Sequence, residues 1–260
     1  MSFLIDTHAH LDFPELFSKL DTIIQNAKDQ NIMKIVSIST NLNKIQRIID
    51  ISSTYDEIYF SVGTHPNEVL KDKNCTNYDL ISELSNISKC VAIGECGLDY
   101  HFGNEDKNLQ KRSFITQINV ARDMNLPVII HSRDADEDMI NIITDEYKKG
   151  AFKAILHCFS SGRDLAICGI DLGFYISFSG IVTFKSAKLI QEIACLVPDN
   201  QILVETDAPY LSPVPVRGSV NEPMNCVYTA KYLSNLRKTK FEDFTQYIYD
   251  NSFNIFNKIS

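Results

Sequence analysis

Three things are missing from this 260-residue sequence: paired cysteines, a long apolar run and a targeting segment. The seven cysteines are scattered and odd in number, and no two have the CxxC spacing. We therefore expect reduced thiols rather than a disulfide framework or a zinc ribbon. No stretch approaches the roughly 18 apolar residues of a membrane span, and no basic segment leads into an apolar one near the start. These absences predict a soluble cytoplasmic protein with no membrane partner.

Positive charge is also scarce. The chain has 25 lysine and arginine residues against 33 aspartate and glutamate residues, which gives a net charge of −8. Such a protein does not attract nucleic acid over its whole surface, so any phosphate binding requires local cations or a bound metal. Low-complexity segments, fixed-period repeats and linkers are absent as well. We expect a single domain that spans residues 1–260.

Short β-branched runs alternate with longer amphipathic segments, such as the predicted helices over 14–30 and 104–124. The runs that predict strands cover residues 3–6, 34–39, 58–63, 90–95, 127–132, 154–159, 173–179 and 202–207. Eight such units favour a parallel sheet closed into a (β/α)8 barrel, of the TIM type. An open doubly wound sheet is the alternative. Its dinucleotide-binding version is disfavoured, because no glycine fingerprint follows the first strand.

Polar side chains gather where the predicted strands end. They are His8, His10, His65, Glu95, His131, His157, Glu205 and Asp207. In a barrel of this class the carboxyl ends of the strands form one face, which carries the chemistry. A single histidine at a strand end is usually a satisfied polar residue, but histidines at four strand ends together indicate a shared metal site. The sixth histidine, His101, lies a few residues beyond Glu95.

The spacing of His8 and His10 supports a metal site. Alternate residues of a strand share a face, with Cα atoms about 6–7 Å apart, so the two imidazoles can converge on one ion. Imidazole and carboxylate ligands suit zinc, manganese, iron or nickel without a thiolate. Cys96 and Cys158 each adjoin a candidate ligand, and we expect them to face away from it and pack.

Six segments carry a family resemblance. They are IDTHAHLDF, VGTHPNE, GECGLDYHF, LPVIIHSRDA, ILHCFSSG and ETDAPYLSPVPVRGSVNEP. In this order they resemble the signature segments of the TatD family of metal-dependent deoxyribonucleases, over nearly the whole chain. The HxH pair alone is shared across the amidohydrolase-like superfamily, whereas its combination with GExGLDY and ETDxPYL is specific.

The resemblance implies two divalent metal ions, Mg²⁺, Mn²⁺ or Zn²⁺. It places His8, His10 and Asp207 on one ion and His131 and His157 on the second, with Glu95 shared between them. With the ligands so placed, we expect Asp207 and Glu95 to be the catalytic carboxylates, because Asp207 would lie beside the attacking water and could accept its proton.

Other residues are expected around these ligands. By resemblance, His65 and Arg133 face the substrate phosphate and Arg217 borders the mouth of the site. We expect Glu205 and Asp6 to support the ligands from behind, although Glu205 could equally form a salt bridge inside the barrel. Tyr100, Phe102 and Tyr210 could stack on bases or serve as hydrophobic lids.

The chain departs from the family pattern at two positions, Asn67 and Val216, where the family often has histidine. Neither residue is an expected metal ligand. The departures therefore bear on substrate contacts more than on the chemistry.

The expected function is hydrolysis of DNA phosphodiester bonds by a monomer, as a 3′–5′ exonuclease on single strands or frayed ends. Two ions can activate water for such a displacement at phosphorus. Aminoacyl-tRNA deacylation, or another ester or amide hydrolysis, is the alternative on the same site. The cyclic amidohydrolase version is disfavoured, because the fourth strand presents Glu95 and not a lysine that could be carboxylated. A binding protein without turnover is disfavoured, because every expected ligand position is occupied by a competent residue.

Overall fold

The computed structural model describes residues 3–103 and 106–260. Residues 1, 2, 104 and 105 lie outside this description, and they include the first two residues of the helix predicted over 104–124. Within the described residues that helix begins at Lys107. No helix in this part of the chain is long and apolar enough to cross a membrane.

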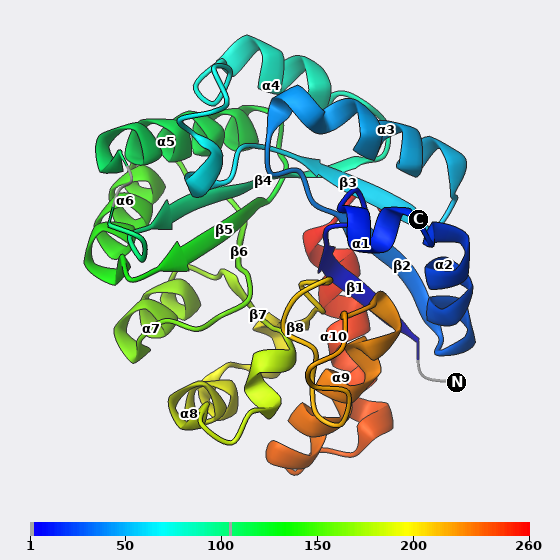
Figure 1. Cartoon of the computed structure of the whole chain (residues 1–260). Coiled ribbons are helices and arrows are strands. Elements are labelled where there is room, and N and C mark those ends of the chain that lie inside the picture. Colours follow the sequence, from blue (N-terminus) through cyan, green and yellow to red (C-terminus); the bar gives the residue numbers. More distant parts are fainter. Residues whose placement is uncertain (1–2, 104–105) are drawn as a thin grey trace.

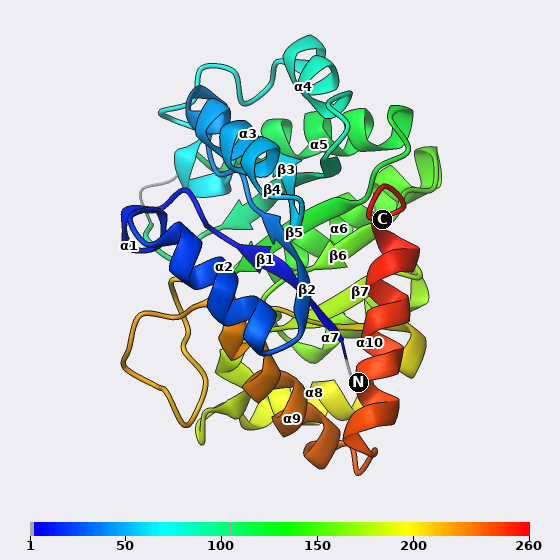
Figure 2. The same cartoon turned by 90° about the vertical axis from the view of Figure 1, so that its right-hand side faces the viewer.

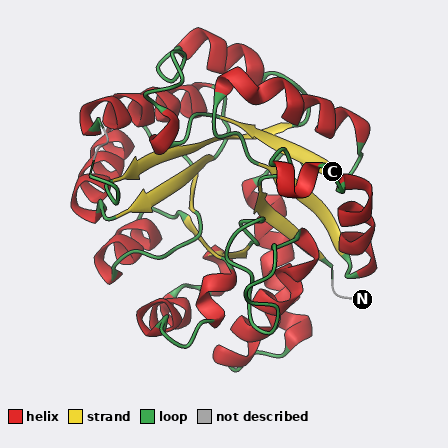
Figure 3. Ribbon diagram, viewed as in Figure 1, coloured by secondary structure: helices red, strands yellow, loops and turns green. Residues whose placement is uncertain are grey.

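The strands form one parallel eight-stranded sheet in which each strand pairs with its neighbour in sequence, from β1 to β8. Backbone hydrogen bonds from His10 N to Ala208 O (2.8 Å) and from Asp207 N to His8 O (2.9 Å) join the first strand to the segment after the last. The sheet therefore curls back on itself, with the helices as a ring outside it (Figures 1 and 3). The predicted (β/α)8 barrel is confirmed.

Strands and helices alternate along the chain. The strands are β1 (Leu4–Ala9), β2 (Ile32–Ser37), β3 (Ile58–Val62), β4 (Cys90–Asp99), β5 (Val128–Arg133), β6 (Ala154–Leu156), β7 (Tyr175–Phe178) and β8 (Ile202–Val204). The helices are α1 (Pro14–Phe17), α2 (Leu20–Asp29), α3 (Ile45–Thr54), α4 (Tyr78–Ser85), α5 (Lys107–Asp123), α6 (Asp136–Lys149), α7 (Arg163–Asp171), α8 (Lys188–Leu196), α9 (Cys226–Leu236) and α10 (Phe241–Ile255). Two short 3-10 turns, η1 (Leu42–Lys44) and η2 (Pro66–Glu68), follow β2 and β3.

The segment predicted as one helix over 14–30 forms two helices. Lys19 leaves helical geometry, with φ −130° and ψ 22°, and separates α1 from α2. Leu16 and Leu20 are both buried, one on each side of the break. Helical spacing of apolar residues reports a continuous buried face, and here that face continues although the helix does not.

The inside of the barrel has its own apolar cluster. Inward-facing strand residues meet residues from α10 and from the segment after it; the cluster is formed by Val36, Ile38, Tyr59, Val91, Ala92, Ile129, Ile155, Leu203, Ile255, Phe256 and Ile259. Figure 2 shows α10 and the C-terminus on the side of the barrel opposite the loop that follows β8. The C-terminal segment thus helps to fill one end of the barrel, and the polar chemistry lies at the other.

Strand β4 runs four residues further than predicted, to Asp99, and pairs there with β5. Glycine is depleted in strands, so Gly97 conceals this extension in the sequence. Gly97 has φ +140°, and a Cβ atom there would lie 2.1 Å from the carbonyl oxygen of His131. The close approach of β4 to β5 beside His131 therefore requires glycine.

Gly97→Ala is expected to destabilise the fold strongly. Overpacking costs about 1–3 kcal/mol, and the positive φ adds about 1–2 kcal/mol. Gly173→Ala is the matched control, since Gly173 has φ +77° but a Cβ atom there would meet no other atom within 4 Å. Urea unfolding of both variants measures the difference. Equal losses of stability in the two variants would show that the close approach of β4 to β5 is not what requires glycine at position 97.

Candidate metal centre

Side chains from six of the eight strands converge at the open end of the barrel. They are His8 in β1, His10 just after it, His65 after β3, Glu95 in β4, His131 in β5, His157 after β6 and Asp207 after β8. The sequence places all of these at strand ends, and the structure brings them together. Arg133, at the end of β5, lies on the rim.

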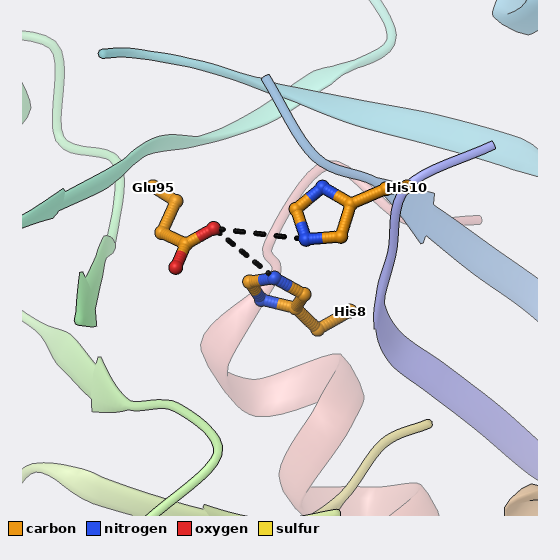
Figure 4. Close-up of side chains that lie close together, drawn as sticks. All are labelled: His8, His10 and Glu95. Carbon is orange, nitrogen blue, oxygen red and sulfur yellow. Dashed lines mark ion pairs between the residues drawn. The ribbon is translucent and has the colours of Figure 1, made fainter. Parts of the chain in front are cut away.

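One group of ligand atoms surrounds one oxygen of the Glu95 carboxylate. Glu95 Oε2 lies 3.4 Å from His8 Nε2 and 3.8 Å from His10 Nε2 (Figure 4). Asp207 Oδ1 lies 3.6 Å and 3.3 Å from the same two imidazole nitrogens. Two imidazoles and two carboxylates therefore face one small volume.

A second group surrounds the other oxygen of the same carboxylate. Glu95 Oε1 lies 2.8 Å from His157 Nε2 and 3.0 Å from His131 Nδ1. His65 Nε2 is 3.4 Å from this oxygen. Glu95 thus contacts both groups, as expected of a ligand shared between two sites.

The charge state of Glu95 suits a cation ligand. Burial raises the pKa of its carboxyl, but the fields of His157, His65 and His8 and the hydrogen bond with His131 outweigh burial and hold that pKa well below its usual range. The pKa of Asp207 is likewise lowered by His10 and its neighbours against the opposing effect of burial. Both carboxylates are therefore ionised near neutral pH.

Unpaired buried atoms test whether these residues fit a metal. Both ring nitrogens of His8, Nδ1 of His10 and Oε2 of Glu95 are buried without a hydrogen-bond partner among the described residues. Such unpaired buried atoms are rare in folded proteins, because the cost of removing them from water is not offset by a hydrogen bond. A divalent cation bound by His8 Nε2 and Glu95 Oε2 would satisfy two of them, and imidazole with carboxylate is a donor set for zinc, manganese or iron. The residues present fit a metal centre.

Glu205 and Asp6 both lie behind the ligands but contact different partners. Glu205 Oε1 lies 3.2 Å from His157 Nδ1 and accepts a hydrogen bond from the backbone of Cys158 (2.8 Å). Asp6 instead accepts from the backbone and hydroxyl of Thr206 (2.9 and 2.6 Å), across the seam between β1 and the segment after β8. Burial raises the pKa of Asp6 to about 7. Glu205 therefore orients an imidazole, while Asp6 holds the barrel closed beside His8.

The two cysteines that adjoin ligands differ. Cys96 is fully buried in the core, as expected. Cys158, expected to pack away from the site, instead lines the cavity, with Sγ 3.1 Å from Ser179 Oγ. The strand β6 ends at Leu156, and Cys158 adopts φ 42°, so the strand alternation behind that expectation does not apply there.

A cavity of about 660 Å³ opens over the metal centre. Of the expected substrate residues, His65 and Arg133 line it, whereas Arg217 is exposed elsewhere and stacks on Phe184, 4.2 Å from the ring centre. Phe102 and Tyr210 also line the cavity and are 64% and 53% exposed. Tyr100 is not among the lining residues and donates its hydroxyl to Asp138 (2.8 Å).

Two charged residues that matter for the site, Lys44 and Asp99, line the cavity and were missed by sequence reasoning. Asn67, noted in the sequence for its bearing on substrate contacts, lines it as well. Asp99 could have been noticed in GECGLDY, had the predicted strand been extended through Gly97. Lys44 carries no local signal, because only the turn η1 after β2 brings it to the rim. Neither Lys44 nor Arg133 forms an ion pair with any residue in the described ranges.

Comparison with known proteins places the chain among relatives of similar length. The sequence model for TatD-related DNases matches residues 5–257. The uncharacterized metal-dependent hydrolase YabD of Bacillus subtilis is 39% identical over 97% of this chain and 98% of its own length. Its counterpart YcfH of Escherichia coli is 37% identical over 98% of this chain and 96% of its own.

A solved structure agrees with the sequence matches. The crystal structure of YjjV, a TatD homologue from Escherichia coli, superposes with a TM-score of 0.91 at 26% identity and covers 98% of both chains. The resemblance read from the six motifs is thereby confirmed, with the same barrel and nearly full coverage. The chain belongs to the family of TatD-related DNases.

Proposed function

We propose that this protein is a metal-dependent hydrolase that cleaves phosphodiester bonds of DNA, removing nucleotides from the 3′ ends of single strands with water activated by two divalent ions. The proposal is supported by the two sets of imidazole nitrogens around the two oxygens of Glu95, in a cavity whose wall also carries Lys44 and Arg133. When bound, the ions supply Lewis-acid polarisation of a phosphoryl oxygen and lower the pKa of water.

The two carboxylates of the centre, Asp207 and Glu95, differ in how far their side chains are exposed to the cavity. The side chain of Asp207 is 14% exposed and that of Glu95 is 3% exposed, although both belong to the same group of ligand atoms. Because Asp207 is ionised and reaches the cavity, it is the carboxylate that orients the attacking water and accepts its proton. Glu95 acts as the shared ligand.

The rim provides the groups that a phosphodiester requires. Arg133 and Lys44 place two positive side chains on the cavity wall of an otherwise acidic protein. Cationic donors stabilise the negative oxygens of a phosphate and the charge that develops on them. Lys44 lies after β2 and Arg133 is the last residue of β5, so they approach the cavity from different parts of the barrel, as contacts to successive phosphates of one strand would require.

Exposed aromatic side chains favour a single strand. Phe102 and Tyr210 are more than half exposed on the cavity wall, and aromatic rings bind unpaired bases without regard to sequence. A cavity of about 660 Å³ is of the size that encloses a small ligand, and it is too small to enclose a duplex. A strand end with one or two nucleotides in the cavity fits these dimensions.

His157→Ala is expected to lower DNA cleavage by at least about 100-fold, because several kcal/mol of metal-dependent stabilisation are lost. The assay uses 5′-labelled and 3′-labelled single-stranded oligonucleotides with Mg²⁺, Mn²⁺, Zn²⁺, Co²⁺ or Ni²⁺, and a chelator should abolish cleavage. His101→Ala is the matched control, since His101 pairs with the exposed Asp134 and does not line the cavity. Circular dichroism of both variants reports the fold.

Two results would count against this proposal. If no metal supports cleavage of DNA while the same preparation deacylates aminoacyl-tRNA, the alternative substrate class replaces DNA. If His157→Ala retains full activity, the proposed centre is not the site of reaction.

Lys44→Ala is expected to raise KM for oligonucleotides with little change in kcat, because the lysine contacts a phosphate away from the reacting bond. Loss of one phosphate contact should also reduce the slope of log affinity against log salt by about 0.7 on a single strand. Lys188→Ala removes the same charge from α8, outside the cavity, and should change neither quantity. An unchanged salt slope in Lys44→Ala would exclude the contact.

A further inference from the structure

Asn67 occupies one of the two positions where the sequence departs from the family pattern, and the structure gives it two partners at the metal centre. Its side chain Nδ2 donates to Asp99 Oδ2 over 2.8 Å. Its backbone N–H donates to His65 Nδ1 over 3.0 Å. Asn67, in the turn η2, thus contacts both the strand β4, which carries the ligand Glu95, and a histidine of the cavity wall.

Asp99 is surrounded by donors. Its Oδ1 accepts from the backbone N–H of His101 (3.0 Å), and its Oδ2 accepts from Asn67 Nδ2. The same Oδ2 lies 3.2 Å from His131 Nε2. Asp99 is 2% exposed, so these three contacts replace water almost completely.

These contacts determine which nitrogen of His131 is free. Since Asp99 accepts at both oxygens, the third partner, His131 Nε2, carries a hydrogen and donates it. Without an ion, His131 Nδ1 donates to Glu95 Oε1, 3.0 Å away. In the neutral ring that a metal requires, Nδ1 is the proton-free nitrogen, and it lies 3.4 Å from His157 Nε2. The lone pair of His131 therefore points at the second group of ligand atoms.

The same reasoning gives His65 the opposite role. Its Nδ1 accepts the backbone hydrogen of Asn67, so the neutral ring carries its hydrogen on Nε2. That N–H points toward Glu95 Oε1, 3.4 Å away. Although His65 lies near the ligand atoms, its inward nitrogen is a hydrogen-bond donor and not a metal ligand.

We propose that Asn67 and Asp99 form a tautomer-setting pair, in which Asp99 is a positioning residue that makes His131 a metal ligand through Nδ1 while Asn67 makes His65 a donor through Nε2. The inference rests on the metal centre of the proposed function, but not on its substrate. Carboxylate partners of this kind fix the orientation of a ligating imidazole and raise its basicity. Here the carboxylate is itself held in place by an uncharged amide.

The backbone of Asp99 is fixed independently of its side chain. Gln110 Oε1 accepts from Asp99 N (3.0 Å), and Gln110 Nε2 donates to Asp99 O (3.1 Å). A change of the Asp99 side chain is therefore expected to leave the end of β4 in place. This allows the pair to be tested without loss of the fold.

Asp99→Asn is the decisive variant. Whichever way the amide is turned, its NH₂ group faces a donor, either His101 N–H on one side or Asn67 Nδ2 and His131 Nε2 on the other. We expect the affinity for the ion held by His131 to fall about 10–100-fold, with the other ion unaffected. Titration calorimetry of chelator-treated protein with Zn²⁺ measures both affinities, and the visible spectrum of the Co²⁺ form reports the change in ligands.

Two further variants separate positioning from general damage. Asp134→Asn removes the same charge from the exposed segment directly after β5, at a residue that pairs only with exposed His101 within the described part of the chain, and should leave both ion affinities unchanged. Asn67→Ala removes the side-chain donor but keeps the backbone N–H, so it should weaken the same ion by a smaller factor. Circular dichroism and thermal unfolding of the metal-free forms test the fold of each variant.

Histidine side-chain ¹H–¹⁵N spectra of the zinc-loaded protein test the tautomers directly. We expect both His65 and His131 to carry hydrogen on Nε2, and Asp99→Asn to change the signals of His131 while those of His65 persist. Hydrogen on Nδ1 of His131, or equal zinc affinities in wild type and Asp99→Asn, would overturn the inference alone. A wild-type protein that binds no divalent ion would overturn both the inference and the proposed function.

Discussion

The buried carboxylate of Glu95 is the constraint on which the rest of the centre depends. It lies at the middle of the barrel mouth, and imidazoles from β1, β3, β5 and β6 approach its two oxygens within 2.8–3.4 Å. A buried anion is costly unless it is paired, and the surrounding imidazoles keep this one ionised. Each neighbouring strand must therefore end at a depth that presents its side chain to Glu95, and this requirement explains the glycine that lets β4 pass close to β5.

Three other carboxylates hold the arrangement from outside, each on a different element. Glu205 contacts His157, Asp99 contacts His131, and Asp6 ties β1 to the segment after β8. Rigid partners of this kind keep ligands near their working geometry before a metal binds. The hydrogen-bond partners behind the histidines also decide which of them can bind a metal. An imidazole whose inward nitrogen carries hydrogen cannot bind an ion but can donate to a phosphate oxygen.

Much of the architecture could be predicted from periodicity alone. Eight β-branched runs separated by amphipathic segments are sufficient for a barrel, since strand and helix periods differ and parallel neighbours need a helical connection. The errors came where tertiary contacts override local patterns. Lys19 interrupts a helix whose buried face continues, and Gly97 conceals the last residues of β4. Cys158 turns into the cavity because its strand has already ended.

The fold class, the family and the residues that gather at the barrel mouth, including the HxH pair near the start of the chain, can all be read from the sequence. They follow from local patterns, because the carboxyl ends of the strands in a parallel barrel lie on one face whatever segments connect them. What each histidine can do depends instead on the folded chain. The role of an imidazole is set by whether its second nitrogen meets a donor or an acceptor, and those partners, such as Asp99 for His131 and Asn67 for His65, come from other strands and turns. Their directions are fixed only when the strands pair in register.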